Sequence, residues 1–178
     1  MSAGPAATSR PVRPEPLALR KALGAFATGV AVVSTQDATG GTVAITINSF
    51  SPVSLEPPLV LWSVRTRSAR HAVFSAARTW TVNILRQPQL ALACRFAQRD
   101  AGPAQDLPWV AGEHGTPRLA DTLAWFECRR ERVIELGDHS VLVGEVLAMQ
   151  RTEGEPLLFF SGQYREYQDR PLPAPASA

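Results

Sequence analysis

The amino-acid sequence predicts a mainly β domain, a β-barrel with a few helices packed around it. Roughly seven segments have strand composition, and turn-forming pairs such as Gly40-Gly41 and Gly137-Asp138 separate several of them. Helical periodicity is confined to short stretches that are scattered among the strands. The regular alternation of strand and helix that builds a parallel sheet is missing, so we expect strands joined by hairpins.

The first part of the chain predicts one helix and three strands. Leu19, Leu23 and Phe26 recur at helical spacing, which indicates a short amphipathic helix over Leu17–Ala27. The β-branched segments that follow predict a hairpin, and a third apolar strand comes after it. The expected strands are Val30–Thr35, Thr42–Asn48 and Leu59–Val64.

The strand Thr42–Asn48 has two faces of opposite character, because side chains alternate across a strand. One face is apolar and the other is small and hydrogen-bonding; the two sets are Val43, Ile45 and Ile47, and Ala44, Thr46 and Asn48. Hydroxyl groups follow the strand, on Ser49, Ser51 and Ser54. Pro57-Pro58 then stops regular pairing. The pattern fits either a half-exposed strand with a serine-rich loop or a polar face that holds a flat ligand.

The rest of the chain predicts two helices and four strands. Pro88 suits the first position of a helix, and Trp109 is expected to tether the long segment Gln98–Arg118, which has no periodicity. The strand His139–Met149 is apolar on both faces and is therefore expected near the centre of the sheet. The expected helices are Ala69–Ala77 and Pro88–Ala97, and the expected strands are Thr79–Leu85, Thr122–Leu136, His139–Met149 and Leu157–Phe160.

Three arginines flank Ser68 around the start of the helix Ala69–Ala77; they are Arg65, Arg67 and Arg70. A helix N-terminus offers unpaired N–H groups and positive potential, so a phosphate group would be favoured there. The alternative is that Ser68 only caps the helix and that the arginines are solvated.

Composition limits the classes of function. A chain of 178 residues with 45% hydrophobic content predicts one domain, and a net charge of +2 does not favour nucleic acid or an anionic membrane as a partner. Cys94 and Cys128 cannot build a disulfide framework, and they lie in apolar settings that would raise their pKa. Residues 1–16 and 169–178 are expected to be disordered tails, and no secretory signal or membrane span is present, which predicts a cytoplasmic protein.

The sequence offers few reactive side chains. There is no Rossmann, Walker or nucleophile-elbow motif, and the three histidines lack the spacing of a metal site. His139 follows the Gly137-Asp138 turn, where it either bonds to its own turn or faces a ligand. A site rich in hydroxyls, amides and arginines, without a nucleophile, indicates a protein whose bound cofactor does the chemistry.

Five motifs in this order resemble the short-chain flavin reductases, which supply reduced flavin to two-component monooxygenases. The resemblance covers Leu17 to about Tyr167, and the disordered tails lie outside it. The motifs are F-A-T-G-V-A-V-V-S-T at Phe26–Thr35, T-I-N-S-F-S-P-V-S-L-E-P-P at Thr46–Pro58, S-A-R at Ser68–Arg70, G-D-H at Gly137–His139 and P-L-L-F-F-S-G-Q-Y at Pro156–Tyr164.

The resemblance implies a split β-barrel of Greek-key type over residues 17–168, with peripheral helices, that forms a homodimer. It implies binding of FMN or FAD, with NADH or NADPH as hydride donor and a monooxygenase component as functional partner. His139 matches a family histidine near the flavin and the nicotinamide, and is the expected catalytic residue. The implied cofactor-binding residues are Thr46, Asn48, Ser49, Ser51, Ser54, Arg65, Ser68, Arg70, His139 and Tyr164.

Three functions remain open from the sequence. The first is an NAD(P)H-dependent flavin reductase, which His139 favours because a passive binder needs no imidazole beside the nicotinamide. The second is a flavin-binding or electron-carrying protein of the same fold. The third is an oxidase of the pyridoxamine phosphate type that keeps FMN bound. The choices between FMN and FAD, and between NADH and NADPH, also remain open.

Overall fold

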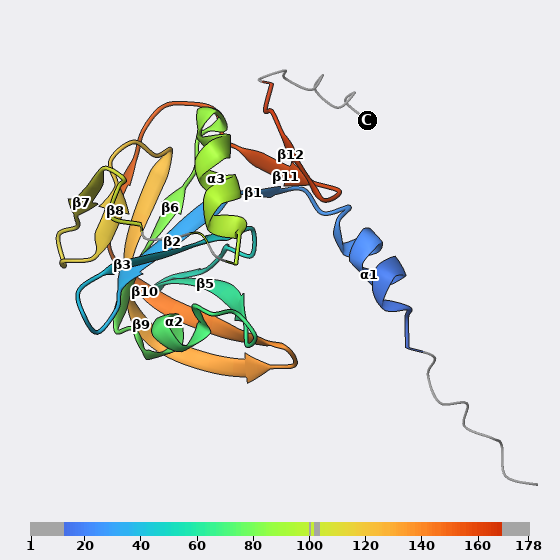
Figure 1. The fold of residues 1–178 in the computed structure, drawn as a ribbon, viewed down its shortest axis with the longest axis horizontal. Helices are drawn as coiled ribbons and strands as arrows, with labels where there is room; N and C mark the ends of the chain where they lie inside the picture. The colour runs from blue at the N-terminus through green and yellow to red at the C-terminus, as the bar shows by residue number, and fades with distance from the viewer. Residues whose placement is uncertain (1–12, 100, 102–103, 169–178) are drawn as a thin grey trace, which may run out of the picture.

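A computed structural model describes residues 13–99, 101 and 104–168. The predicted tails lie outside these residues, apart from positions 13–16. The described chain is mainly β, as predicted, and is built around one antiparallel sheet of seven strands (Figure 1). In the order of the sheet, the strands are β3 (Thr42–Ile47), β2 (Ala31–Gln36), β6 (Thr79–Ile84), β9 (Ala124–Leu136), β10 (His139–Arg151), β5 (Pro58–Arg65) and β4 (Ser51–Leu55).

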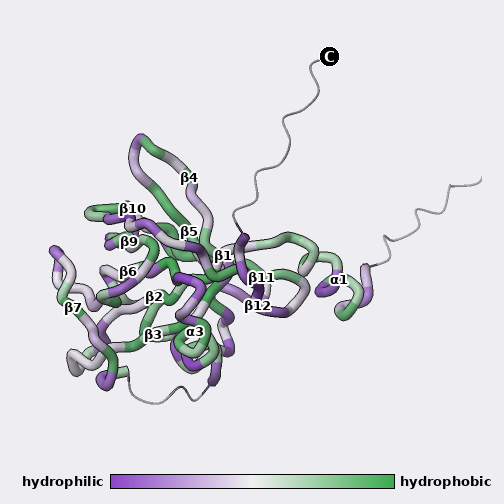
Figure 2. Tube along the Cα trace, turned by 90° about the horizontal axis from the view of Figure 1, so that it is seen from above, coloured by the Kyte–Doolittle hydropathy of each residue, from purple (hydrophilic) through white to green (hydrophobic). Residues whose placement is uncertain are grey.

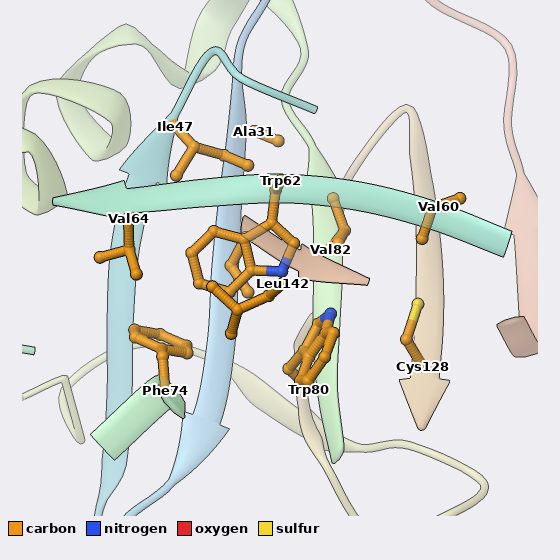
Figure 3. Close-up of a cluster of buried hydrophobic side chains, with 11 residues drawn as sticks. Ala31, Ile47, Val60, Trp62, Val64, Phe74, Trp80, Val82, Cys128 and Leu142 are labelled. Carbon is orange, nitrogen blue, oxygen red and sulfur yellow. The ribbon is translucent and has the colours of Figure 1, made fainter. Parts of the chain in front are cut away.

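The seven-stranded sheet curves around a core but does not close into a hydrogen-bonded barrel. Its two edges are β3 and β4, and β5 crosses over β2 and β6 with the core between them (Figure 3). Trp62, Phe74 and Trp80 are fully buried there and meet edge to face, with ring centroids 5.1 and 6.1 Å apart. Burial of these rings adds apolar stabilisation to the curved sheet.

A second apolar cluster covers the outer face of β2 and β3. Helix α3 (Leu90–Ala97) lies on this face and buries Ala93 and Phe96, and Trp109 packs against Phe96 (Figure 1). The segment after α3 is not an open loop, because it carries the hairpin of β7 (Trp109–Ala111) and β8 (Pro117–Leu119). Trp109 tethers this segment, as predicted.

Two smaller pieces complete the fold. The strands β1 (Thr28–Gly29), β11 (Leu158–Phe160) and β12 (Gln163–Arg165) form a separate sheet. The short helix α2 (His71–Ala76) places Phe74 in the main core, and a 3-10 turn, η1 (Gln87–Gln89), precedes α3. Among the described residues, no helix is long and apolar enough to cross a membrane.

The first helix is shorter than predicted. Helix α1 spans Pro16–Leu23, whereas the prediction extended to Ala27. The carbonyl of Gly24 accepts a hydrogen bond from the N–H of Ser161, so it is not available to a further helical turn. Thr28 then pairs with Phe159 as a strand residue. Contact with the β11–β12 turn therefore ends the helix.

The serine-rich segment after β3 is a strand rather than a loop, and the expectation that Pro57-Pro58 stops regular pairing was wrong for Pro58, which pairs with Leu55. Strand β4 pairs with β5 and turns at Glu56-Pro57, and a bulge interrupts the pairing between Pro52 and Ser54. Because β4 is an edge strand, Pro52 need not donate a hydrogen bond to a further neighbour. Pro58 is the first residue of β5, a position where proline is also tolerated.

Candidate functional site

The end of β3 supplies polar groups at an opening in the fold. Ile47 packs in the main core, whereas the Thr46 hydroxyl faces α3 and donates a hydrogen bond to the carbonyl of Ala93 at 2.8 Å. Asn48 follows the strand and is exposed. The alternation predicted for this strand is therefore present, but α3 already takes up the Thr46 hydroxyl.

Ser49 connects the end of β3 to β5. Its hydroxyl accepts a hydrogen bond from the N–H of Ser63 at 3.0 Å and lies 3.2 Å from the Ser63 carbonyl, to which it donates. The side chain of Ser49 is thus used to hold two strands together where the chain leaves the sheet. Because the Ser49 hydroxyl already bonds to Ser63, the group of Ser49 that is left to contact a ligand is its backbone.

A pocket of about 470 Å³ opens beside these residues. It lies between the end of β3, the segment that joins β5 to α2, and the C-terminal end of α3. Its volume is in the range of sites that hold small molecules. The lining residues are Ile45, Thr46, Ile47, Asn48, Ser49, Ser63, Val64, Arg65, Arg67, Ser68, Ala69, Arg70, Ala97, Gln98, Arg99 and His139.

The pocket is strongly cationic. Four arginines line it, and no aspartate or glutamate does; the arginines are Arg65, Arg67, Arg70 and Arg99. Arg70 donates from Nη1 to the carbonyl of Gln98 at 3.0 Å, which joins two walls of the pocket. Such a lining favours a ligand that carries phosphate groups, because guanidinium binds phosphate through paired N–H donors.

Ser68 does not cap helix α2, contrary to that interpretation of the sequence. The helix begins at His71, and the residue at its N-cap position is Arg70, which makes no side-chain capping bond. The Ser68 hydroxyl instead accepts from the N–H of Arg70 at 3.3 Å, within a turn that precedes the helix. The cationic character of this segment therefore comes from the arginine side chains rather than from a capped helix end.

His139 lines the same pocket, where β10 begins. It pairs with Arg65 of β5, and its Nδ1 lies 2.8 Å from the carboxylate of Asp138. The bond to His139 is the main cause that lowers the pKa of Asp138, and the charges of His139 and Arg65 add to it. The bond to Asp138 fixes the ring while one ring nitrogen remains for a ligand, so both interpretations of His139 fit this geometry.

Not every residue implied by the resemblance lies in this pocket. Ser51 and Ser54 are on the edge strand β4, outside the pocket lining. Tyr164 lines a neighbouring hollow of about 160 Å³ that shares Thr46 and Asn48 with the pocket. Burial is the main cause that raises the pKa of Tyr164, and contact with Cys94 adds to it.

Some pocket residues were not chosen from the sequence. Ala97, Gln98 and Arg99 reach the pocket only because α3 ends beside the segment that joins β5 to α2. Their sequence shows no motif, and an arginine after a helix is an ordinary surface feature. These three residues could be identified only by knowing that α3 packs on β3, and the sequence alone does not show that packing.

The described residues contain no set of metal ligands and no activated nucleophile beside the pocket. Burial raises the pKa of the Cys128 thiol to about 12, so this cysteine is an inert core residue, as predicted. Cys94, by contrast, is exposed on α3, so the expectation of an apolar setting was wrong for it. The pocket is suited to binding and orienting a phosphorylated ligand rather than to covalent catalysis.

Comparison with protein families gives a match over most of the chain. Residues 23–168 match the model of the flavin reductase like domain. The chain belongs to the flavin reductase-like family. This membership confirms the family resemblance. The ligand to compare with the pocket is therefore a flavin.

Individual flavin reductases are similar over nearly the same region. The chain is 44% identical over 148 residues to "FMN reductase (NADH) SmoA" of Agrobacterium fabrum, covering 83% of this chain and 84% of that protein. It is 36% identical to "Flavin-dependent monooxygenase, reductase subunit HsaB" of Rhodococcus jostii, covering 90% and 83%. The structure of "NADH:FAD oxidoreductase SgcE6 in complex with NAD and FAD fragments" from Streptomyces globisporus superposes with a TM-score of 0.82 at 35% identity, covering 90% and 98%.

The pocket fits a flavin phosphate. The arginine lining without carboxylates matches its charge, and the polar end of β3 lies beside an apolar floor that includes Ile45, Ile47 and Val64. A flat ring with polar edges can contact both kinds of surface.

Proposed function

We propose that this flavin reductase-like protein is an enzyme that transfers a hydride from NADH to a flavin and supplies the reduced flavin to a partner monooxygenase. The observation that carries the proposal is the single pocket in which the end of β3, the arginines and His139 meet. The relatives named as NADH-dependent flavin reductases and as a reductase subunit support the donor and the partner. An enzyme that uses NADH works where NADH is present, which supports a cytoplasmic location.

The residues of the pocket have separate parts in this reaction. The flavin and the nicotinamide supply the hydride chemistry when they are bound. Asn48 and the backbone at Ser49 hold the flavin ring at the end of β3, and Thr46 keeps α3 in place beside it. The segment with Arg65, Ser68 and Arg70 faces the flavin phosphate, and His139 orients the nicotinamide from the start of β10. Tyr164 extends the site into the neighbouring hollow.

Ser51 and Ser54 are the weakest members of the proposed site. They lie on β4 beyond the pocket lining, and the Ser51 hydroxyl donates to the carbonyl of Pro52 at 3.1 Å. Their place in the site depends on a flavin that reaches beyond the pocket to the edge strand.

We further infer that residues 17–168 form one split-barrel domain that works as a homodimer. The free edges β3 and β4 are the opening of the split barrel. Helix α1 supports the dimer, because it has eight residues, none of them buried, and stands apart from the main sheet (Figure 2). A helix this short is not stable in water without tertiary contacts. A second copy that covers Leu19 and Leu23 provides them.

One assay tests the proposed function. Purified protein is mixed with NADH or NADPH and with FMN or FAD in catalytic or excess amounts, and absorbance at the nicotinamide band is followed. We expect oxidation of NADH well above the flavin-only background and faster than that of NADPH. No oxidation above the background would rule out the reductase. Protein that stays yellow through gel filtration would point instead to a flavin carrier or to an oxidase of the pyridoxamine phosphate type.

A further inference from the structure

Arg70 and Arg99 both line the pocket, but the structure gives their guanidinium groups different surroundings. Arg70 donates to the carbonyl of Gln98, the residue at the C-cap position of α3. The last carbonyls of a helix lack partners within the helix and lie at its negative end, so a cation there is stabilising. Arg70 therefore holds the end of α3 against the segment that joins β5 to α2.

Arg99 is the residue after Gln98, whose carbonyl accepts the hydrogen bond from Arg70. It is exposed, it lines the pocket, and it makes no ion pair or side-chain hydrogen bond within the described part of the chain. Arg95, one helical turn earlier, shows the contrasting case. It is held by both carboxylate oxygens of Asp106 at 2.7 and 2.8 Å, and the bond to Asp106 raises its pKa. Of these two arginines, Arg99 is the one that the fold leaves for a ligand.

We propose that Arg99 contacts the flavin phosphate and that Arg70 is a positioning residue that acts through Arg99. This inference rests on the proposed function, and it divides the arginines of the site into a contact and its support. A phosphate monoester carries nearly two negative charges at neutral pH and binds guanidinium through paired hydrogen bonds. Loosening the end of α3 would move Arg99 away from the phosphate without removing any contact to the flavin ring.

The test compares FMN with riboflavin, which has the same ring but no phosphate. Dissociation constants are measured by flavin fluorescence, so the result does not depend on turnover. A hydrogen bond to a charged group is worth about 1.5–3 kcal/mol, so Arg99→Ala is expected to weaken FMN binding by roughly tenfold to a hundredfold. Riboflavin binding should change by less than about twofold. Arg151→Ala, on the exposed end of β10, removes the same charge outside the pocket and should leave both constants unchanged.

Arg70 is tested through the same ratio and through a double-mutant cycle. Arg70→Ala should also weaken FMN binding but not riboflavin binding, and Arg70→Lys should recover most of the loss because it keeps a cation and a donor for the Gln98 carbonyl. In the Arg99→Ala background, Arg70→Ala should have little further effect, since the two residues act as one unit.

Two results would overturn the inference. Equal effects of Arg99→Ala on FMN and riboflavin would show that Arg99 does not contact the phosphate. Additive losses in the double variant would show that Arg70 contacts the phosphate itself. A wild-type protein that binds FMN more tightly than riboflavin but does not oxidise NADH would contradict the proposed function and leave this inference standing.

Discussion

His139 shows how one side chain can serve both its own turn and a ligand. Its ring is held by Asp138 at 2.8 Å and it also lines the pocket, so the two interpretations of this residue are not exclusive. Its place opposite Arg65 follows from the register of β10 and β5. The sequence indicated His139 through its position after a turn. That this turn lies beside the arginines could not be predicted, because it depends on how β10 pairs with β5 in the sheet.

We expect His139→Ala to slow NADH oxidation by about tenfold or more, because a nicotinamide that is not held in the reactive orientation reacts more slowly. The dissociation constant for FMN should change by much less, since the ring and phosphate contacts remain. The measurements are kcat under flavin saturation and Kd by fluorescence titration. His114→Ala is the matched control, because His114 lies in the loop before β8, outside the pocket. Similar losses in kcat and in flavin affinity would contradict the role given to His139.

Glu127 is a buried charge that sequence reasoning did not identify. It lies on β9, and its carboxylate accepts hydrogen bonds from the hydroxyl of Thr116 at 2.6 Å and from the N–H groups of His114 and Thr116. Burial is the largest single influence and raises the pKa of Glu127, but these hydrogen bonds together outweigh it, so the pKa lies below its ordinary value. The carboxylate thus anchors the β7–β8 hairpin to the main sheet.

Glu127→Gln should lower the free energy of unfolding at pH 7 by about 2 kcal/mol, because the amide cannot accept all of these hydrogen bonds. Since the folded pKa is lowered, the contribution of Glu127 is present above the unfolded pKa and is lost as pH falls through the folded pKa. In urea denaturation, the free energy of unfolding should therefore fall less between pH 7 and pH 3 for the variant than for the wild type. Glu131→Gln, exposed on the same strand, is the control. An unchanged acid dependence in Glu127→Gln would refute the anchor.

At the scale of elements, periodicity predicted the strands whose bounds are determined by the local sequence. The strands β2, β3 and β6 and the pair β9–β10 appear within a few residues of their expected bounds, because alternation and turn residues determine them. Strand β4 was missed, since Pro52 within it and Pro57-Pro58 after it argue against pairing unless the strand is known to be an edge. The position of an element in a sheet depends on distant partners, so local sequence does not contain it.

Gly144 lies where β10 crosses the core. A Cβ at this position would come within 2.8 Å of Trp80 and 3.0 Å of Cys128. Both neighbours are fully buried, so neither can move easily. The sheet therefore needs a residue without a side chain at this point, next to a break in register between Val143 and Gly144.

We expect Gly144→Ala to lower the free energy of unfolding by about 1–3 kcal/mol through overpacking. The measurement is chemical denaturation at neutral pH. Gly29→Ala is the matched control, because a Cβ there meets nothing within 4 Å and the backbone is not left-handed. If the two variants lose the same stability, the close contact with Trp80 is not the cause.

At the scale of the whole molecule, the candidate site exists only where four distant parts of the chain meet. The end of β3, the segment after β5, the end of α3 and the start of β10 each line part of the pocket. The sequence indicated the first two through serines and arginines, and the start of β10 through His139. It gave no sign of the third, because the approach of α3 depends on the second apolar cluster.

The association of two copies is the last property that depends on the whole molecule. Helix α1 exposes 44% of Leu19 and 66% of Leu23, which lie one turn apart on one side of the helix. If a second copy covers this side, Leu23→Glu buries a charge in the interface and should shift the protein towards the monomer by at least tenfold in dissociation constant. Sedimentation over a range of concentrations measures the shift, and Lys21→Glu, a substitution to the same residue elsewhere on the helix, should leave it small. A wild type that is monomeric at every concentration, or a Leu23→Glu variant as dimeric as the wild type, would show that α1 meets something other than its own copy.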